Sequence, residues 1–197
     1  MSPLAALAVA LLVTGSTAAY GQNARPGFIP EPKGLHEGGD YGYTPHTIQG
    51  GTVLDTSGVA KLLQTQHPLL IDVAELDRKP PNMNPDMPWL PQHRSIPGAV
   101  WLPGAGSPVK DAAFDAALTR RVGQLADGDK AKPIVVFCHP DCWGSYNAAR
   151  RLISYGYRNV YWYRDGMEGW QSEHDTAVIK PDADWLASKP AELTKGK

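Results

Sequence analysis

Residues 133–156 read PIVVFCHPDCWGSYNAARRLISYG and combine a strand, a loop and a helix. The segment begins with a continuous apolar run rich in β-branched residues, which is typical of a strand buried within a parallel sheet. Beyond the loop, Ala148, Ala149 and Leu152 recur on one side of a helix. Gly156 then ends that helix. A buried strand followed by an amphipathic helix predicts an α/β domain.

The same alternation extends to both sides of this segment. Two further helices are expected, one capped by Asp55 or Thr56 and one over residues 111–126. Three further short apolar runs predict strands: LLIDVA (69–74), AVWLP (99–103) and VYWY (160–163). Strands that alternate with helices predict a mainly parallel central sheet flanked by helices.

The composition is that of a globular protein with one domain. The chain has 197 residues, 42% of them apolar, and a formal net charge of −1. Because no basic excess exists to neutralise phosphates, nucleic acid is not an expected partner. The six prolines from Pro80 to Pro97 exclude a ladder or helix and predict a rigid loop. Two cysteines exclude a disulfide-rich scaffold and a tetrahedral metal site made of cysteines alone.

The first residues have the pattern of a secretory signal. Residues 3–14 are apolar and small residues follow, which places a cleavage site near Ala18 to Gly21. A run of about a dozen residues is too short to span a membrane, and no later segment is long and apolar enough. We therefore expect an exported, periplasmic protein in an oxidising compartment, with no membrane span after cleavage. The alternative is an apolar N-terminal helix of the fold.

The chain is accordingly expected to have four parts. Residues 1–21 form the signal peptide, and residues 22–51, rich in Gly, Pro and His, form an irregular arm that packs on the domain. Residues 52–172 form the α/β domain. Residues 173–197 are polar and weakly patterned, and we expect a C-terminal tail.

Cys138 occupies the position where chemistry is expected. It ends the most apolar strand, and open parallel sheets bind ligands at the carboxyl ends of their strands. The amides of the loop and of the following helix would favour a thiolate there. A thiolate is the attacking species in sulfur transfer and in disulfide exchange. The alternative is a buried, inert cysteine that packs as a small hydrophobic group.

Four segments, in order, resemble the rhodanese-like domain family. They are VVFC with the helix that carries Ala148-Ala149, LLIDVA with its aspartate Asp72, SIPGA (95–99), and VYWY followed by DGMEGW (160–170). The resemblance implies a rhodanese-like fold over roughly residues 52–172, with Cys138 as the nucleophile and no cofactor beyond a persulfide sulfur on it. Asp72 is expected to fix the neighbouring loop through hydrogen bonds. The residues that the resemblance places in the substrate-binding loop are His139, Asp141, Trp143, Gly144 and Ser145.

A narrower resemblance is to the exported CXXCW-motif proteins, which are associated with catabolism that depends on pyrroloquinoline quinone. This sequence has three residues between its cysteines rather than two. The resemblance implies a thiol or sulfur acceptor as partner, within a periplasmic quinoprotein system. It is carried by Cys142-Trp143, Asn147-Ala148-Ala149-Arg150, Trp89 with His93-Arg94, and Asp-Tyr-x-Tyr-x-Pro over 40–45.

The loop departs from the family at one position. A typical rhodanese loop carries a basic residue five positions after the cysteine, and here that position is Trp143, which offers an indole N–H and no charge. Arg94, from the proline-rich loop, is a candidate substitute for that cation. The alternative is an ordinary solvated arginine.

The second cysteine, Cys142, permits redox chemistry. If the loop curves back, the two Cα atoms approach the roughly 5.5–6 Å that a disulfide favours. Cys138 would then attack, Cys142 would resolve and a partner would reduce the bond. The alternative is a structural clip, which constrains the unfolded chain little in so small a loop.

Three functions remain open. The first is an exported rhodanese-like enzyme that uses Cys138 for sulfur transfer or thiol chemistry. The second is a binding module on the same fold, which the missing loop cation favours. The third is a copper(I) carrier, but the Ile-Pro-Gly-Ala and Gly-Trp landmarks do not fit the thioredoxin-like fold of copper-delivery proteins, so we expect no metal site. Its candidate ligands would be Cys138, His139, Asp141 and Cys142, with Met83 and Met87 as more distant thioethers.

Overall fold

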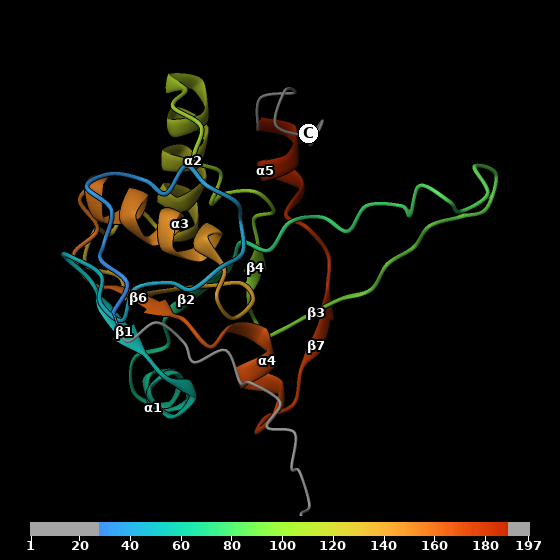
Figure 1. Cartoon of the computed structure of the whole chain (residues 1–197). Helices are drawn as coiled ribbons and strands as arrows, with labels where there is room; N and C mark the ends of the chain where they lie inside the picture. The colour runs from blue at the N-terminus through green and yellow to red at the C-terminus, as the bar shows by residue number, and fades with distance from the viewer. Residues whose placement is uncertain (1–27, 189–197) are drawn as a thin grey trace, which may run out of the picture.

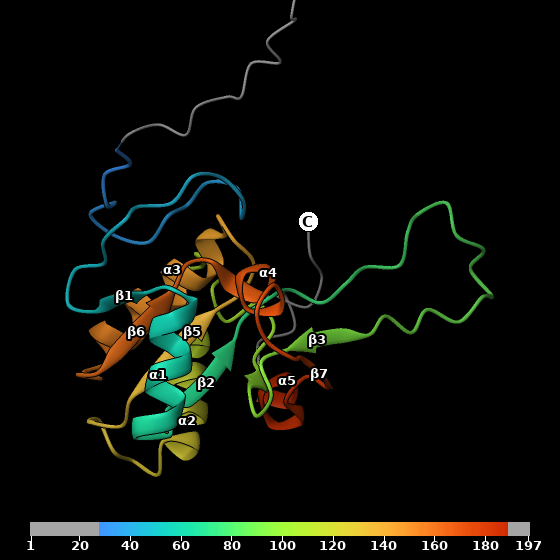
Figure 2. The same cartoon turned by 90° about the horizontal axis from the view of Figure 1, so that it is seen from below.

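A parallel sheet of five strands forms the centre of the protein (Figures 1 and 2). The structure is a computed structural model that describes residues 28–188. The strand order is β1-β6-β5-β2-β4, and every neighbouring pair is parallel, so the carboxyl ends share one edge. This confirms the predicted α/β class. The strands are β1 (Thr52–Leu54), β2 (Leu69–Asp72), β4 (Val100–Trp101), β5 (Ile134–Phe137) and β6 (Val160–Tyr163).

The central strand β5 explains the unbroken apolar run in the sequence. All four of its residues are buried, because β2 and β6 flank it and helices cover both faces. Its register with β2 runs from Leu69 opposite Ile134 to Asp72 opposite Phe137. Cys138 therefore leaves the sheet at the carboxyl edge, next to the end of β2.

Two helices cover each face of the sheet (Figure 1). The helices α2 (Ala112–Leu125) and α3 (Trp143–Ser154) pack on one face. The helices α1 (Thr56–Gln66) and α4 (Gly166–Gln171) pack on the other. The predicted cap of α1 is confirmed, since the Asp55 carboxylate accepts the Gly58 N–H at 2.8 Å.

The prediction for the proline-rich segment is wrong at its C-terminal end. His93–Ser95 forms β3, which pairs antiparallel with β7 (Ala177–Ile179). The ladder forms because no proline lies between Pro91 and Pro97, so every backbone N–H there is available. The residues before β3 project from the body as a long loop (Figures 1 and 2).

The prediction of a tail after residue 172 is also wrong for the described part. Beyond β7 the chain forms α5 (Ala183–Ser188), and the Trp185 side chain is fully buried. Its indole N–H donates to the Pro103 carbonyl at 2.9 Å and its ring lies edge-on to Phe114, with centroids 5.6 Å apart. A single large side chain anchors this segment, and one tryptophan among polar residues produces no periodic pattern.

The N-terminal arm is described from residue 28 onward. From residue 28 to the start of β1 the arm contains no helix or strand, and it packs against α3 (Figure 1). The expected signal peptide and its cleavage site lie outside the described residues, so export stays a prediction. Of the helices between residues 28 and 188, none has the length and apolarity to cross a membrane.

Candidate functional site

The two cysteines lie at the two ends of one short loop. Cys138 follows β5 directly, and Cys142 is the N-cap residue of α3. The helix thus begins earlier than expected, because α3 starts at Trp143 and includes Gly144 and Ser145, which were expected in the loop. These two residues are weak helix formers, yet Ser145 fits the first turn because its hydroxyl donates to the Cys142 carbonyl at 3.1 Å.

Cys138 and Cys142 form a disulfide with their Cα atoms 6.6 Å apart. This separation lies within the range that a disulfide tolerates. Asp141 has φ of +50°, a left-handed conformation that is uncommon for a residue with a side chain. The loop therefore curves back on itself, as the spacing of the cysteines requires.

The surroundings of Cys138 differ from the expectation. Its side chain is fully buried in the core cluster with Val73 and Val136, and its sulfur contacts the His139 carbonyl oxygen at 3.7 Å rather than a ring of amides. A disulfide sulfur has no proton to donate, so this contact is not a hydrogen bond. The cause is the alternation of side chains in β5, which turns position 138 toward the α2–α3 face.

The N-terminal arm closes over the loop. The Gly42 N–H donates to the Asp141 carbonyl at 2.9 Å, and the Trp143 N–H donates to the Asp40 carbonyl at 2.8 Å. Between them, Tyr41 forms an antiparallel bridge with Cys142. The arm thus pairs with the loop as a short strand would, and it occupies the first amide of α3.

Asn147 holds the arm in place from α3. Its side-chain carbonyl accepts the His36 N–H at 2.8 Å, and its amide donates to the His36 carbonyl at 3.0 Å and to the Gly106 carbonyl at 3.2 Å. This buried amide therefore ties three segments together: the arm, α3 and the loop before α2. No pattern in the sequence indicates this role of Asn147, because its partners lie far away in the chain.

Trp143 fills the position where a typical rhodanese loop has its cation. Its ring stacks on His36 with centroids 3.8 Å apart and meets Tyr146 edge-on at 5.4 Å. Burial and the nearby Glu31 carboxylate raise the pKa of Tyr146 to about 12. The position is therefore packed with aromatic rings and carries no guanidinium or ammonium group.

His139 and Glu168 form a pair at the outer side of the loop. The His139 Nδ1 atom lies 2.8 Å from the Glu168 carboxylate of α4, and both side chains are partly exposed. The exposed Tyr41 ring lies 6.4 Å from the His139 ring. Partial burial, together with the charges of Asp40 and Glu168, raises the pKa of Tyr41. Polar side chains from the arm, the loop and α4 thus meet at the outer side of the loop.

Arg164 brings a cation near the loop that sequence analysis missed. It follows β6, as Cys138 follows β5, and its guanidinium lies 3.7 Å from the Asp141 carboxylate. It also donates to the Thr44 hydroxyl at 3.3 Å and to His46 Nδ1 at 3.0 Å. The rule that ligand-binding groups gather at the carboxyl ends of parallel strands would have found it.

Arg94 does not replace the missing loop cation. It lies on β3, where its guanidinium donates to the Thr176 hydroxyl at 2.7 Å and to the Thr176 carbonyl at 3.0 Å. The β3–β7 ladder, in which Arg94 lies opposite Val178, holds the Arg94 side chain beside Thr176.

Asp72 has the structural environment that was expected. Its buried carboxylate accepts the Ser95 hydroxyl at 2.7 Å and the Ala74 N–H at 2.9 Å, and it lies 2.7 Å from His93 Nε2. The His93 ring in turn stacks on Trp101 with centroids 3.8 Å apart. Asp72 therefore attaches β3 to the end of β2. Strand alternation directs it to the face opposite Cys138.

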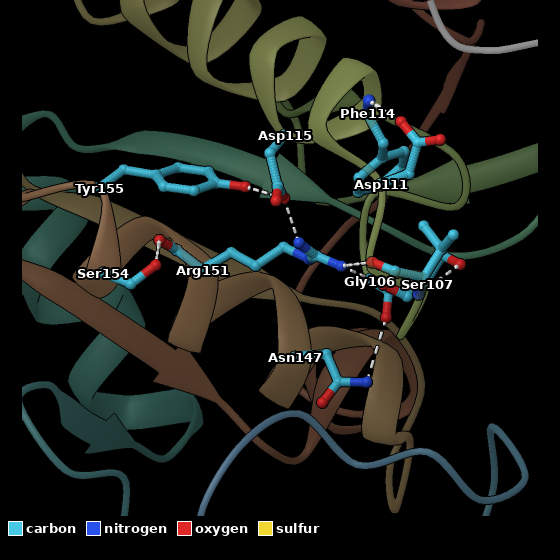
Figure 3. A network of polar contacts seen from close by, with 10 residues as sticks. Gly106, Ser107, Asp111, Phe114, Asp115, Asn147, Arg151, Ser154 and Tyr155 are labelled. Atoms are coloured by element: carbon cyan, nitrogen blue, oxygen red, sulfur yellow. Dashed lines mark hydrogen bonds and ion pairs between the residues drawn. The ribbon is translucent and has the colours of Figure 1, made fainter.

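A polar network holds the loop that precedes α2 against α3 (Figure 3). The Arg151 guanidinium of α3 pairs with Asp115 and donates to the Ser107 carbonyl at 3.0 Å, and the Tyr155 hydroxyl donates to Asp115 at 2.5 Å. Together with Asn147, this network holds residues 102–109 against α3. The first turn of α3 is thus fixed on one side by this loop and on the other by the arm.

Within residues 28–188, no group of three or more His, Cys, Asp or Glu side chains is arranged to hold a metal ion. Both sulfurs are engaged in the disulfide, so neither is a thiolate ligand in this state. Met87 is exposed in the projecting loop, where an apolar side chain has few contacts.

The family model for the rhodanese-like domain matches residues 55–173. The chain belongs to the rhodanese-like domain family. Similar solved structures include a thiosulfate sulfurtransferase from Pseudomonas aeruginosa (21% identity, TM-score 0.46), with 70% of this chain and 23% of that chain covered. This chain thus spans about a quarter of that protein's length. No match was found among the curated proteins.

Two smaller structures are similar over most of their own length. The Alr3790 protein from Anabaena sp. is 20% identical with a TM-score of 0.43, and the match covers 64% of this chain and 92% of that chain. A human single-domain sulfurtransferase is 20% identical with a TM-score of 0.38, and the match covers 62% of this chain and 97% of that chain.

Proposed function

We propose that this rhodanese-like protein performs sulfur transfer or thiol–disulfide exchange through the Cys138–Cys142 pair. The observation that carries the proposal is the disulfide itself, which joins the end of the central strand to the N-cap of α3. Its position at the carboxyl edge of the sheet is where open parallel sheets bind ligands. A clip across so short a loop would stabilise the fold only modestly, which favours a chemical role.

Two reactions balance with these cysteines, one with a partner dithiol and the other with a sulfane-sulfur donor and an acceptor thiol. In exchange, a partner dithiol gives two electrons to the disulfide, becomes a disulfide itself and leaves two cysteine thiols on this protein. In sulfur transfer, a persulfide donor gives its outer sulfur to one reduced cysteine thiolate, which becomes a persulfide, and the donor leaves as a thiolate. An acceptor thiolate then attacks that outer sulfur, becomes the new persulfide and releases the cysteine thiolate. No metal or organic cofactor takes part in either reaction.

The proposal extends to the cellular setting. We place the protein in the periplasm, where the lack of a reducing thiol pool lets such a disulfide persist between reactions. The partner is a thiol or sulfur acceptor, and the resemblance to the CXXCW-motif proteins favours one that serves a quinoprotein pathway. The apolar residues 3–14 and the Cys142-Trp143 pair support this placement.

A second function, a binding module, is favoured by a different observation. Trp143 and His36 fill the position of the usual loop cation, and the arm covers the loop. A domain that has lost transfer activity would use this surface to recognise a partner without cysteine chemistry.

Mass spectrometry of the protein isolated from its own compartment, with free thiols alkylated at lysis, tests these functions. Sulfur chemistry predicts a mixture of disulfide, dithiol or persulfide forms that changes when the host's sulfur source or oxidant is changed. A disulfide that is never reduced under any condition contradicts it.

The Cys138→Ser, Cys142→Ser double variant separates the two functions. Loss of the phenotype of the quinoprotein pathway, with wild-type amounts of folded protein, supports the chemical role. An unchanged phenotype supports the binding module and overturns the chemical role.

A further inference from the structure

We infer that Cys142, not Cys138, is the sulfur with which the partner thiol forms the mixed disulfide. Cys138 is then the buried leaving and resolving thiol. The inference rests on the proposed function, and it assigns the two cysteines the opposite roles from those that sequence analysis expected.

The two cysteines differ in access. Cys138 is 0% exposed, whereas Cys142, which belongs to the same buried cluster, keeps 8% of its surface exposed. An attacking thiolate must approach the sulfur that it will bond to, from the side opposite the leaving sulfur, so accessibility decides which sulfur is attacked. A partner that attacked Cys138 would have to enter the core among Val73 and Val136.

The two thiolates would also differ in stability. Cys142 is the N-cap residue of a helix of 12 residues, and its side chain makes no capping hydrogen bond while it is in the disulfide. An N-cap side chain is placed to accept the amides of the second and third helical residues, here Gly144 and Ser145. Reduction therefore frees the Cys142 sulfur to become a thiolate held by these amides and by the helix dipole. The Cys138 sulfur faces a carbonyl oxygen, which offers no such stabilisation.

Gly144 lies beside the Cys142 sulfur. An ideal Cβ at position 144 would lie 3.4 Å from that sulfur, which is the limit of ordinary contact. The Tyr41 bridge holds the Cys142 backbone. Cys142 is thus fixed at the backbone, and the glycine places no side chain against its sulfur.

The exchange then has two balanced steps. A partner thiolate attacks the Cys142 sulfur, the bond between the two cysteines breaks, and Cys138 leaves as a thiolate that takes a proton from water. The second thiolate of the partner then attacks the partner's own sulfur in the mixed disulfide and expels the Cys142 thiolate. The partner dithiol is oxidised by two electrons, and this protein's disulfide is reduced.

The test compares the single variants Cys138→Ser and Cys142→Ser, each of which leaves one free thiol. Rates of alkylation by iodoacetamide are measured from about pH 5 to pH 9, against glutathione as a model thiol. We expect the thiol at 142 to react at least about tenfold faster near pH 6 than the thiol at 138, because each unit of pKa changes the thiolate fraction about tenfold.

Wild-type protein provides a measurement that does not depend on how the variants fold. It is treated with a limiting amount of a monothiol, the mixed disulfide is trapped by acid, and the modified cysteine is identified by peptide mapping. Modification of Cys142 supports the inference. Modification of Cys138, or faster alkylation at 138, overturns it and leaves the proposed function intact. A disulfide that no thiol opens, with neither variant faster than glutathione, overturns both.

Discussion

Gly106 and Gly144 make the closest backbone approach at the site, and replacing Gly106 with alanine tests whether that approach holds the cysteine loop. An ideal Cβ at position 106 would lie 2.5 Å from the Gly144 Cα and closer still to the Gly144 carbonyl. Ordinary contact begins near 3.4 Å, so one of the two backbones must move by about 1 Å. The Gly106 carbonyl also accepts the Asn147 amide at 3.2 Å, and this bond would weaken.

The expected cost follows from these two contacts. Overpacking against a backbone costs about 1–3 kcal/mol, and a weakened hydrogen bond adds about 1 kcal/mol. We therefore expect Gly106→Ala to lower the free energy of unfolding by about 2–4 kcal/mol. The matched control is Gly123→Ala in α2, where a Cβ meets nothing within 4 Å. Because alanine is the better helix former, this control should raise the free energy of unfolding by about 0.5–1 kcal/mol.

Urea unfolding of both variants, followed by tryptophan fluorescence with the disulfide intact, measures the two changes. Opposite shifts of the urea midpoint are expected. Because Gly144 is two residues from Cys142, the Gly106 variant should also change the rate at which a monothiol opens the disulfide. A wild-type midpoint for Gly106→Ala, with the expected gain for Gly123→Ala, would refute the close approach as a structural restraint.

Three further outcomes are expected. Reduction of the Cys138–Cys142 disulfide should lower the free energy of unfolding by about 2 kcal/mol, because closing so small a loop removes only that much conformational entropy from the unfolded chain. An unchanged urea midpoint would contradict this. Trp185→Ala should cost about 3–5 kcal/mol because it empties a buried site, whereas Trp89→Ala in the projecting loop should cost little; equal costs would show that α5 is not part of the core. Stability should be unaffected by tyrosine ionisation below about pH 10, the usual phenol value, and should fall as the pH rises toward 12. The reason is that burial raises the pKa of three phenols to about 12, so the folded state resists their ionisation. Absorbance titration, with unfolding monitored by circular dichroism, would detect this loss of stability. Titration of every tyrosine near pH 10 in the folded protein would contradict the prediction. These phenols belong to Tyr146, Tyr155 and Tyr163.

The main elements of the fold could be predicted because their signals are local. The apolar run of β5, the cap of α1 and the glycine after α3 each depend on a few neighbouring residues. The missed elements were short or had isolated anchors. β1 has three residues, and the segment after residue 172 relies on the single buried Trp185.

The amino-acid sequence alone determined that a cysteine would lie at the carboxyl end of the central strand, because the patterns that predict strands and helices involve only neighbouring residues. Only the tertiary structure decided that Cys142 keeps a small exposed surface while Cys138 has none, since that depends on segments far apart in the chain. Asn147 joins α3 to His36 across 111 positions, and the arm it holds covers the loop. Packing of this kind is set by shape and by the satisfaction of buried polar groups, and neither produces a periodic pattern in the sequence.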